Sequence, residues 1–200
     1  MDLSGKRILV TGGTGFLGHP LLQELKARKP AEVLAPRSSE CDLTLEKDVA
    51  RLFKDFSPDL VIHAAARVGG IEYNRTHAGE VYYANAMMNT LVPEYARRAG
   101  VKKFVAVGSV CAYPKVGALP FREDILWDGY PEETNGPYGM AKKMMLVQMQ
   151  AYRQQFGMAG AYLLMVNLYG PNDHFNDTSS HVIPAMIYKC EKAIETKAPS

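Results

Sequence analysis

The side chains best suited to proton transfer lie in two short segments of the sequence. Ser109 and Cys111 directly follow the apolar run Phe104–Val107, and Tyr138 and Lys142 lie together near the start of a segment with helical spacing. Because Tyr138 and Lys142 are four residues apart, they share one face of that helix. The ammonium of Lys142 favours the phenolate and so lowers the pKa of Tyr138. A phenol tuned in this way can give a proton to a carbonyl oxygen, to which Ser109 would also hydrogen-bond.

Tyrosine–lysine pairs at this spacing occur by chance on many helices, but here a glycine-rich turn precedes the pair in the chain. Gly12, Gly15 and Gly18 lie between an expected strand and an expected helix. Such glycines allow a tight turn and a close approach of the backbone to a pyrophosphate, which the helix N-terminus then binds. The pattern predicts a bound dinucleotide, whose nicotinamide cation would favour the Tyr138 phenolate further. We expect the dinucleotide to contact Gly12, Gly15, Phe16, Gly18, Ala64, Ala65, Tyr138 and Lys142.

The loop after the second expected strand indicates which dinucleotide binds. A protein that prefers NAD places an acid there, about 20 residues after the glycines, to bind the ribose 2′-hydroxyl. The sequence instead has Arg37, Ser38 and Ser39, which suit the 2′-phosphate of NADP. Asp42 is placed to contact the adenine. Two simpler interpretations stay open, in which Arg37 is a solvated loop arginine and Asp42 is an exposed acid of the same loop.

The elements that must position these residues alternate along the chain. The expected strands are 7–11, 32–35, 60–64, 103–108 and 161–168, and the expected helices are 16–27, 45–56, 77–99 and 140–156, with Thr44 as a cap for the second. Apolar strands that alternate with amphipathic helices predict βαβ units and a parallel sheet covered on both faces. The fold class is therefore α/β, a doubly wound Rossmann fold.

The composition of the chain excludes several classes of protein. The 200 residues are 47% apolar, enough for one substantial core, and the net charge of +2 comes from interspersed acids and bases, which argues against a nucleic-acid binder. We find no signal-peptide pattern and no apolar run of about 18 residues, so we expect no membrane segment. The cysteines Cys41, Cys111 and Cys190 are too few and scattered for a disulfide framework or a zinc site. We therefore expect no metal and a cytoplasmic protein.

Five longer segments carry more specific patterns. They are HAAARVGGI at 63–71, GSVCAYPK at 108–115, TNGPYGMAKK at 134–143, VNLYGPNDHF at 166–175 and SHVIPAMI at 180–187. Together they resemble the extended short-chain dehydrogenase/reductases and, within them, the GDP-L-fucose synthase family. The sequence departs from that family at Val110, where a second serine is usual, at Met165-Val166, where a proline–threonine pair is usual, and at Lys189, which stands in place of an arginine.

The resemblance implies an NADPH-dependent epimerase-reductase that acts on a GDP-linked 4-keto-6-deoxy sugar. The implied reaction inverts carbons three and five and then reduces the ketone at carbon four, which gives GDP-L-fucose or a close relative. In that family the base corresponds to Cys111 and the opposing acid to His181, whereas Asn167, His181 and Lys189 correspond to positions at the substrate. The resemblance also implies a homodimer.

The same resemblance divides the chain into two regions. Residues 1–168 are expected to form the NAD(P)-binding Rossmann domain with the catalytic serine, tyrosine and lysine. Residues 169–200 are expected to begin a nucleotide-sugar-binding region that is incomplete in this sequence.

Several alternatives stay open on the sequence alone. Cys111 can be a small packed residue, and His181 can simply begin a helix. Among enzymes, an NAD(P)-dependent nucleotide-sugar 4-epimerase or 4,6-dehydratase is the alternative, although a dehydratase needs an acidic pair where Val110 and Cys111 stand. The chain can also be a cofactor-binding fragment without turnover. Asn85 and Asn89, on the long expected helix, are expected to bond the backbone rather than a ligand.

Overall fold

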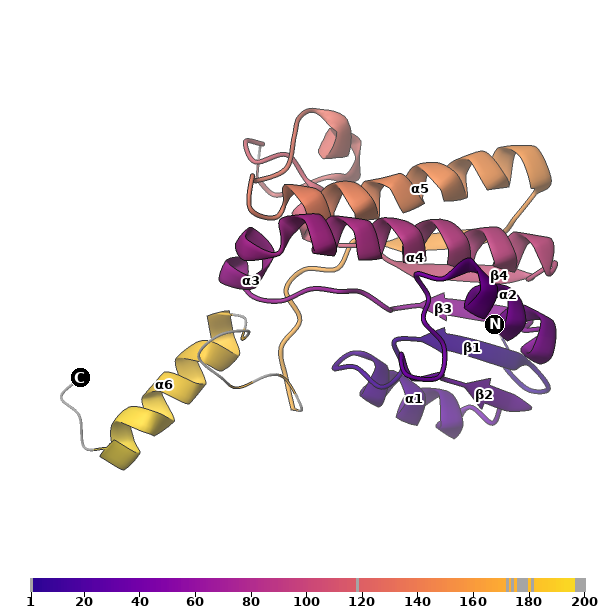
Figure 1. The fold of residues 1–200 in the computed structure, drawn as a ribbon, viewed down its shortest axis with the longest axis horizontal. Helices are drawn as coiled ribbons and strands as arrows, with labels where there is room; N and C mark the ends of the chain where they lie inside the picture. The colour runs from indigo at the N-terminus through magenta and orange to yellow at the C-terminus, as the bar shows by residue number, and fades with distance from the viewer. Residues whose placement is uncertain are drawn as a thin grey trace.

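A parallel sheet forms the centre of the molecule. The computed structural model describes residues 2–117, 119–171, 173, 175, 180 and 182–196. The sheet has five strands in the order β2-β1-β3-β4-β5 (Figure 1). The strands are β1 (Arg7–Thr11), β2 (Glu32–Leu34), β3 (Leu60–His63), β4 (Lys103–Val107) and β5 (Gly160–Leu163). Because the chain leaves β1 first toward β2 and then toward β3 on the other side, the doubly wound fold predicted from the sequence is confirmed.

Helices cover both faces of this sheet. On one face lie α2 (Glu46–Phe56), α4 (Ala78–Arg98) and α5 (Gly136–Phe156), and on the other lies α1 (Gly18–Ala27) (Figure 1). Successive side chains of a strand point to opposite faces, so each strand contributes to both cores. Leu9, Val61 and Phe104 pack with α2, α4 and α5, whereas Ile8, Val10 and Leu60 pack with Leu25 of α1. All these side chains are buried.

Three of the differences between the structure and the expected elements lie near the site. A short helix, α3 (Ile71–Thr76), precedes α4. The helix expected at 140–156 begins at Gly136, since Pro137 fits the first turn of a helix, where its missing N–H costs nothing. The last strand ends at Leu163 rather than Leu168, and the N–H of Met165 bonds the carbonyl of Leu163 in a tight turn just after it.

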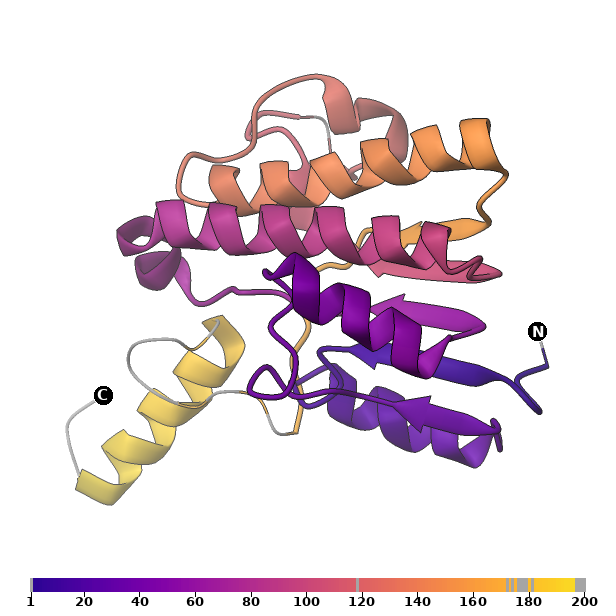
Figure 2. The ribbon, with the colours of Figure 1, turned by 45° about the vertical axis from the view of Figure 1, so that its right-hand side comes forward.

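The chain after β5 leaves the body of the sheet. Residues 164–171 run past the carboxyl ends of the strands toward α6 (Val182–Thr196), which lies apart from the sheet in both views (Figures 1 and 2). Ile183, Pro184 and Ile187 of α6 line a small apolar pocket together with Tyr169 and Phe175. Among the described helices, none is both long and apolar enough to cross a membrane.

A glycine lets α5 approach the loop that follows β4. This loop forms a short 3-10 helix, η1 (Val110–Ala112), and a second one, η2 (Glu123–Trp127), lies further along. A Cβ atom on Gly139 would overlap the carbonyl oxygen of Cys111 and lie 3.4 Å from the Cα of Ala112. Any side chain at position 139 must therefore push α5 away from η1 or distort η1 itself.

This packing predicts that Gly139→Ala destabilises the protein. The expected loss is about 1–3 kcal/mol in the free energy of unfolding, as for other overpacked sites, despite the higher helix propensity of alanine. Gly79 of α4 is a matched control, because a Cβ atom there would meet nothing within 4 Å. Urea unfolding of both variants measures the difference. Equal stability of Gly139→Ala and the parent would contradict the close approach.

Candidate active site

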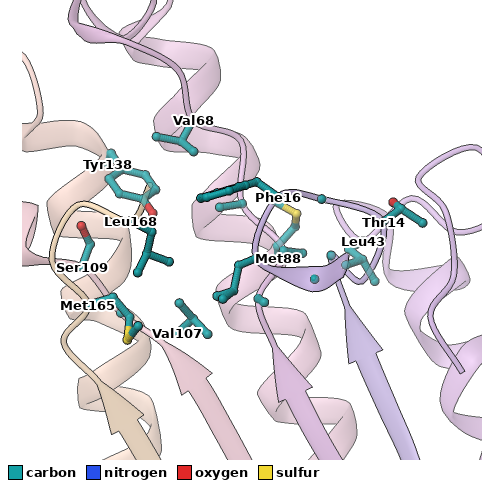
Figure 3. Close-up of a pocket in the computed structure, with 18 of the residues that line it drawn as sticks. Thr14, Phe16, Leu43, Val68, Met88, Val107, Ser109, Tyr138, Met165 and Leu168 are labelled. Carbon is teal, nitrogen blue, oxygen red and sulfur yellow. The ribbon is translucent and has the colours of Figure 1, made fainter. Parts of the chain in front are cut away.

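A cleft lies at the carboxyl ends of the strands. Its volume is about 560 Å³, and its walls come from the turn after β1, the loops after β2, β3 and β4, the start of α5 and the segment 165–168. Figure 3 shows the strands pointing at the cleft, with Ser109 and Tyr138 on one side and Thr14 on the other. This is the crevice in which open α/β sheets bind their ligands.

The glycine-rich turn forms one end of the cleft. Gly12 has a positive φ of 73°, and a Cβ atom there would lie 2.6 Å from the backbone nitrogen of Ala65. A Cβ on Gly18 would overlap the carbonyl oxygen of Gly12. Only glycine therefore lets the turn close against the end of β3 and the start of α1. Gly12, Gly15, Phe16, Gly18, Ala64 and Ala65, which the sequence predicts as cofactor contacts, all line the cleft.

The loop after β2 agrees only partly with the sequence prediction. Pro36, Ser38 and Asp42 line the cleft, but Arg37 is exposed and is not part of the lining. The N–H of Arg37 donates to the carboxylate of Glu40 at 2.9 Å. The Asp42 carboxylate accepts bonds from the N–H and the hydroxyl of Thr44, which lower its pKa. Thr44 thus makes no side-chain cap for α2, contrary to our expectation.

Tyr138 and Lys142 are both buried at the start of α5. The Lys142 ammonium donates to the carbonyl oxygen of Val107 at 2.9 Å and lies 5.7 Å from the centre of the Tyr138 ring. Burial lowers the pKa of Lys142 to about 8. Burial, with a smaller effect from Cys111, raises the pKa of Tyr138 above its usual value. The chain's own side chains therefore keep Tyr138 protonated, whereas the sequence predicts a lowered pKa with a nicotinamide cation beside it.

Ser109 and Cys111 line the cleft on the same side as Tyr138. The Ser109 hydroxyl accepts the N–H of Cys111 at 3.1 Å and so caps η1. A hydroxyl that accepts one bond keeps its own hydrogen available for donation. Cys111 is a free, half-buried thiol, whereas Cys41 is buried and Cys190 exposed. The cleft thus brings a hydroxyl donor, a phenol donor and a thiol to one wall.

Beneath this wall a chain of buried hydrogen bonds connects β1, β3, α4 and α5. The Asn89 amide nitrogen donates to the carbonyl of Ala141 at 3.1 Å, so its oxygen faces Nε2 of His63, also at 3.1 Å. Nε2 must then carry the proton, and Nδ1 accepts from the Thr11 hydroxyl at 2.6 Å. Burial and the nearby charge of Lys142 lower the pKa of His63 to about 3. A neutral His63 therefore joins the ends of β1 and β3 to the helix that carries Tyr138.

The expectation for the asparagines of α4 is confirmed. Asn85 bonds the backbone of Arg67 and Val81, and Asn89 bonds the backbone of Ala141. Sequence reasoning did not find the part played by Thr11 and His63. The one signal in the sequence was that Thr11 and His63 are polar residues at the ends of two buried strands.

The residues expected at the substrate are spread more widely. Asn167 is exposed and lines the cleft, whereas Lys189 is an exposed residue of α6 outside the lining. His181 lies outside the described residues. The described part of the chain holds no group of three or more His, Cys, Asp or Glu side chains able to bind a metal ion.

The comparisons with known proteins agree with this geometry. The family model described as NAD dependent epimerase/dehydratase family matches residues 8–198. The GDP-L-fucose synthase of Sinorhizobium fredii is 41% identical over 191 residues, which cover 96% of this chain and 60% of that protein. The GDP-L-colitose synthase of Yersinia pseudotuberculosis is 34% identical over 192 residues, or 95% of this chain and 62% of that protein.

A solved structure gives the same result for the fold. The GDP-L-fucose synthetase of Naegleria fowleri bound to NADP superposes with a TM-score of 0.87 at 30% identity, over 100% of this chain and 66% of that one. The chain spans about 60% of the length of the curated relatives that it matches. The family model matches nearly all of the chain, and the glycine turn, Ser109 and Tyr138 line the cleft, with Lys142 buried behind Tyr138. The chain belongs to the NAD dependent epimerase/dehydratase family.

Proposed function

We propose that the complete protein is an NADPH-dependent epimerase-reductase of a GDP-linked 4-keto-6-deoxy sugar. It inverts carbons three and five and then reduces carbon four, which gives GDP-L-fucose or a close relative. The observation that carries the proposal is the presence of Cys111 beside Ser109 and Tyr138 in one cleft. The names of the similar proteins, GDP-L-fucose synthase and GDP-L-colitose synthase, support the same class of substrate.

The proposed epimerisation uses Cys111 and His181. Protons on carbons three and five are acidic because the neighbouring ketone accepts the electron pair as an enolate. Cys111, as thiolate, removes such a proton, and His181 returns one to the opposite face of the carbon, which inverts it. A thiolate and an imidazolium are suited to these two steps near neutral pH.

The proposed reduction uses Ser109, Tyr138 and Lys142. NADPH, when bound along the glycine turn, supplies the hydride for carbon four. Ser109 and Tyr138 hold the ketone oxygen by hydrogen bonds, and Tyr138 gives its proton to that oxygen as the alcohol forms. The raised pKa of Tyr138 means that the proton is present at neutral pH. Lys142 then stabilises the phenolate that remains.

We also propose that residues 1–168 bind the cofactor and that residues 169–200 begin the nucleotide-sugar-binding region. The packing of α6 against Tyr169 and Phe175, away from the sheet, supports a separate region (Figure 2). Asn167 and Lys189, together with His181, are the proposed substrate contacts.

We further propose a homodimer that works in the cytoplasm. The outward surfaces of α4 and α5 support self-association, because Tyr82, Tyr83, Val147 and Phe156 are exposed there. Sedimentation equilibrium gives the mass and decides between a monomer and a dimer.

The first functional prediction concerns the cofactor. Calorimetry is expected to show that NADPH binds more tightly than NADH. Replacing Arg37 with alanine should remove about tenfold of the NADPH affinity, the value of one charge-assisted hydrogen bond, and leave NADH unchanged. Arg28→Ala is the control, since Arg28 is an exposed cation at the C-terminal end of α1, whereas the glycine turn lies at the N-terminal end. An Arg37→Ala variant that keeps the parent preference removes Arg37 from the proposed 2′-phosphate site.

The second functional prediction separates a base from a packing residue at position 111. In deuterium oxide, with the complete protein and oxidised cofactor, NMR follows the exchange of the protons on carbons three and five of the keto sugar. Cys111→Ser is nearly isosteric but a much weaker base, so exchange is expected to slow at least about a hundredfold. Cys190→Ser is the control, because Cys190 is an exposed thiol outside the cleft lining. Exchange at the parent rate in Cys111→Ser would instead favour a simple ketoreductase or a 4-epimerase.

A further inference from the structure

Two asparagines connect the loop after β3 to the start of α5, the helix that carries Tyr138 and Lys142. Asn74 of α3 is 3% exposed, and its amide oxygen accepts the N–H of Gly69 at 3.3 Å. Its amide nitrogen donates to the side-chain oxygen of Asn135 at 3.1 Å, across 61 residues of sequence. Asn135 is the residue immediately before α5 and donates in turn to the Glu132 carboxylate at 3.0 Å.

The ionised carboxylate of Glu132 fixes which atom donates and which accepts in each of these hydrogen bonds. Bonds from Thr134 and Asn135 lower the pKa of Glu132, so its carboxylate is ionised and can only accept. Asn135 must therefore present its amide nitrogen to Glu132 and its oxygen to Asn74. Asn74 must then present its nitrogen to Asn135 and its oxygen to Gly69. A flip of either amide would oppose two acceptors or two donors.

The two ends of this chain of hydrogen bonds lie next to different walls of the cleft. Val68 and Gly69, in the loop after β3, line one part of the cleft. Tyr138, which follows Asn135 by three residues, lines another (Figure 3). Other bonds of the loop lead elsewhere. Arg67 donates to the Tyr73 hydroxyl at 3.1 Å and pairs with Glu80 at 2.7 Å, and neither contact reaches α5.

We propose that Asn74 is a positioning residue that fixes the Val68–Gly69 wall relative to Tyr138, and so sets the space that the ketone end of the substrate enters. The inference rests on the proposed function for the identity of the substrate. Asn74 itself touches neither the substrate nor the reacting atoms. Loss of its amide frees the wall from α5 but leaves the glycine turn and its cofactor contacts in place.

The test is the variant Asn74→Leu, which keeps the size of the side chain and removes both bonds. In the complete protein, kcat/KM for the keto sugar is expected to fall about tenfold, as for the loss of a hydrogen bond that acts during catalysis. The NADPH dissociation constant is expected to stay within about twofold, since the change lies away from the glycine turn. Amide exchange of Gly69 is expected to accelerate by about tenfold or more.

A double-mutant cycle with Asn135→Ala shows whether the two residues act through each other. Once Asn135→Ala has removed the partner, Asn74→Leu is expected to lower kcat/KM by less than about threefold. Tyr73→Phe is the control, because it removes a bond that holds the same loop to α3 only. Tyr73→Phe is expected to leave kcat/KM within about twofold of the parent. If a general loosening of the loop were enough to impair catalysis, Tyr73→Phe would lower kcat/KM as well.

Three results would overturn the inference. They are a parent-like kcat/KM in Asn74→Leu, additive effects of the two variants, and a fall in NADPH affinity equal to the fall in kcat/KM. Failure of the proposed function looks different, because the parent itself would not turn over the keto sugar. The exchange rate of Gly69 in Asn74→Leu, Asn135→Ala and the double variant then still measures the coupling, and additive exchange rates reject it.

Discussion

The close contact between α5 and the chain that leaves β4 is the constraint on which the site depends. Gly139 has no side chain where the carbonyl of Cys111 passes, and the Lys142 ammonium is held by the carbonyl of Val107. A buried ammonium is costly unless it is hydrogen-bonded, so this bond also fixes the position of the helix along β4. Tyr138, Ser109 and Cys111 share one wall of the cleft because these two contacts bring their backbones together.

The glycine-turn side and the Tyr138 side of the cleft are joined beneath the cleft rather than across it. The glycine turn closes on Ala65, and Thr11, which precedes that turn, begins the buried chain that passes through His63 and Asn89 to Ala141. All three side chains are fully buried, so water cannot replace a lost partner and each group must keep its orientation. The glycine turn and the helix that carries Tyr138 and Lys142 are thus joined through one buried network.

The sequence was sufficient for features that depend on local pattern. The alternation of strands and helices predicted the sheet, and the spacing of Tyr138 and Lys142 placed both on one helix. Contacts between distant segments could not be read in this way, because no local pattern pairs Asn74 with Asn135. For Thr11 and His63 the only signal was that each is a polar residue at the end of a buried strand, which does not show that the two bond each other. The loop after β2 shows the same limit, since Arg37 has a suitable charge but is exposed and is not among the residues that line the cleft.

The central proposal is that NADPH bound in this cleft gives hydride to a ketone whose oxygen is held by Ser109 and Tyr138. The most direct measurement supplies the complete protein with a GDP-linked 4-keto-6-deoxyhexose and NADPH that carries deuterium at the transferable position of the nicotinamide. NMR of the product then locates the label. The account predicts deuterium at carbon four of a sugar with inverted carbons three and five, and a Tyr138→Phe variant that binds NADPH but transfers no label. A product without deuterium at carbon four, or label transfer at the parent rate in Tyr138→Phe, would contradict it.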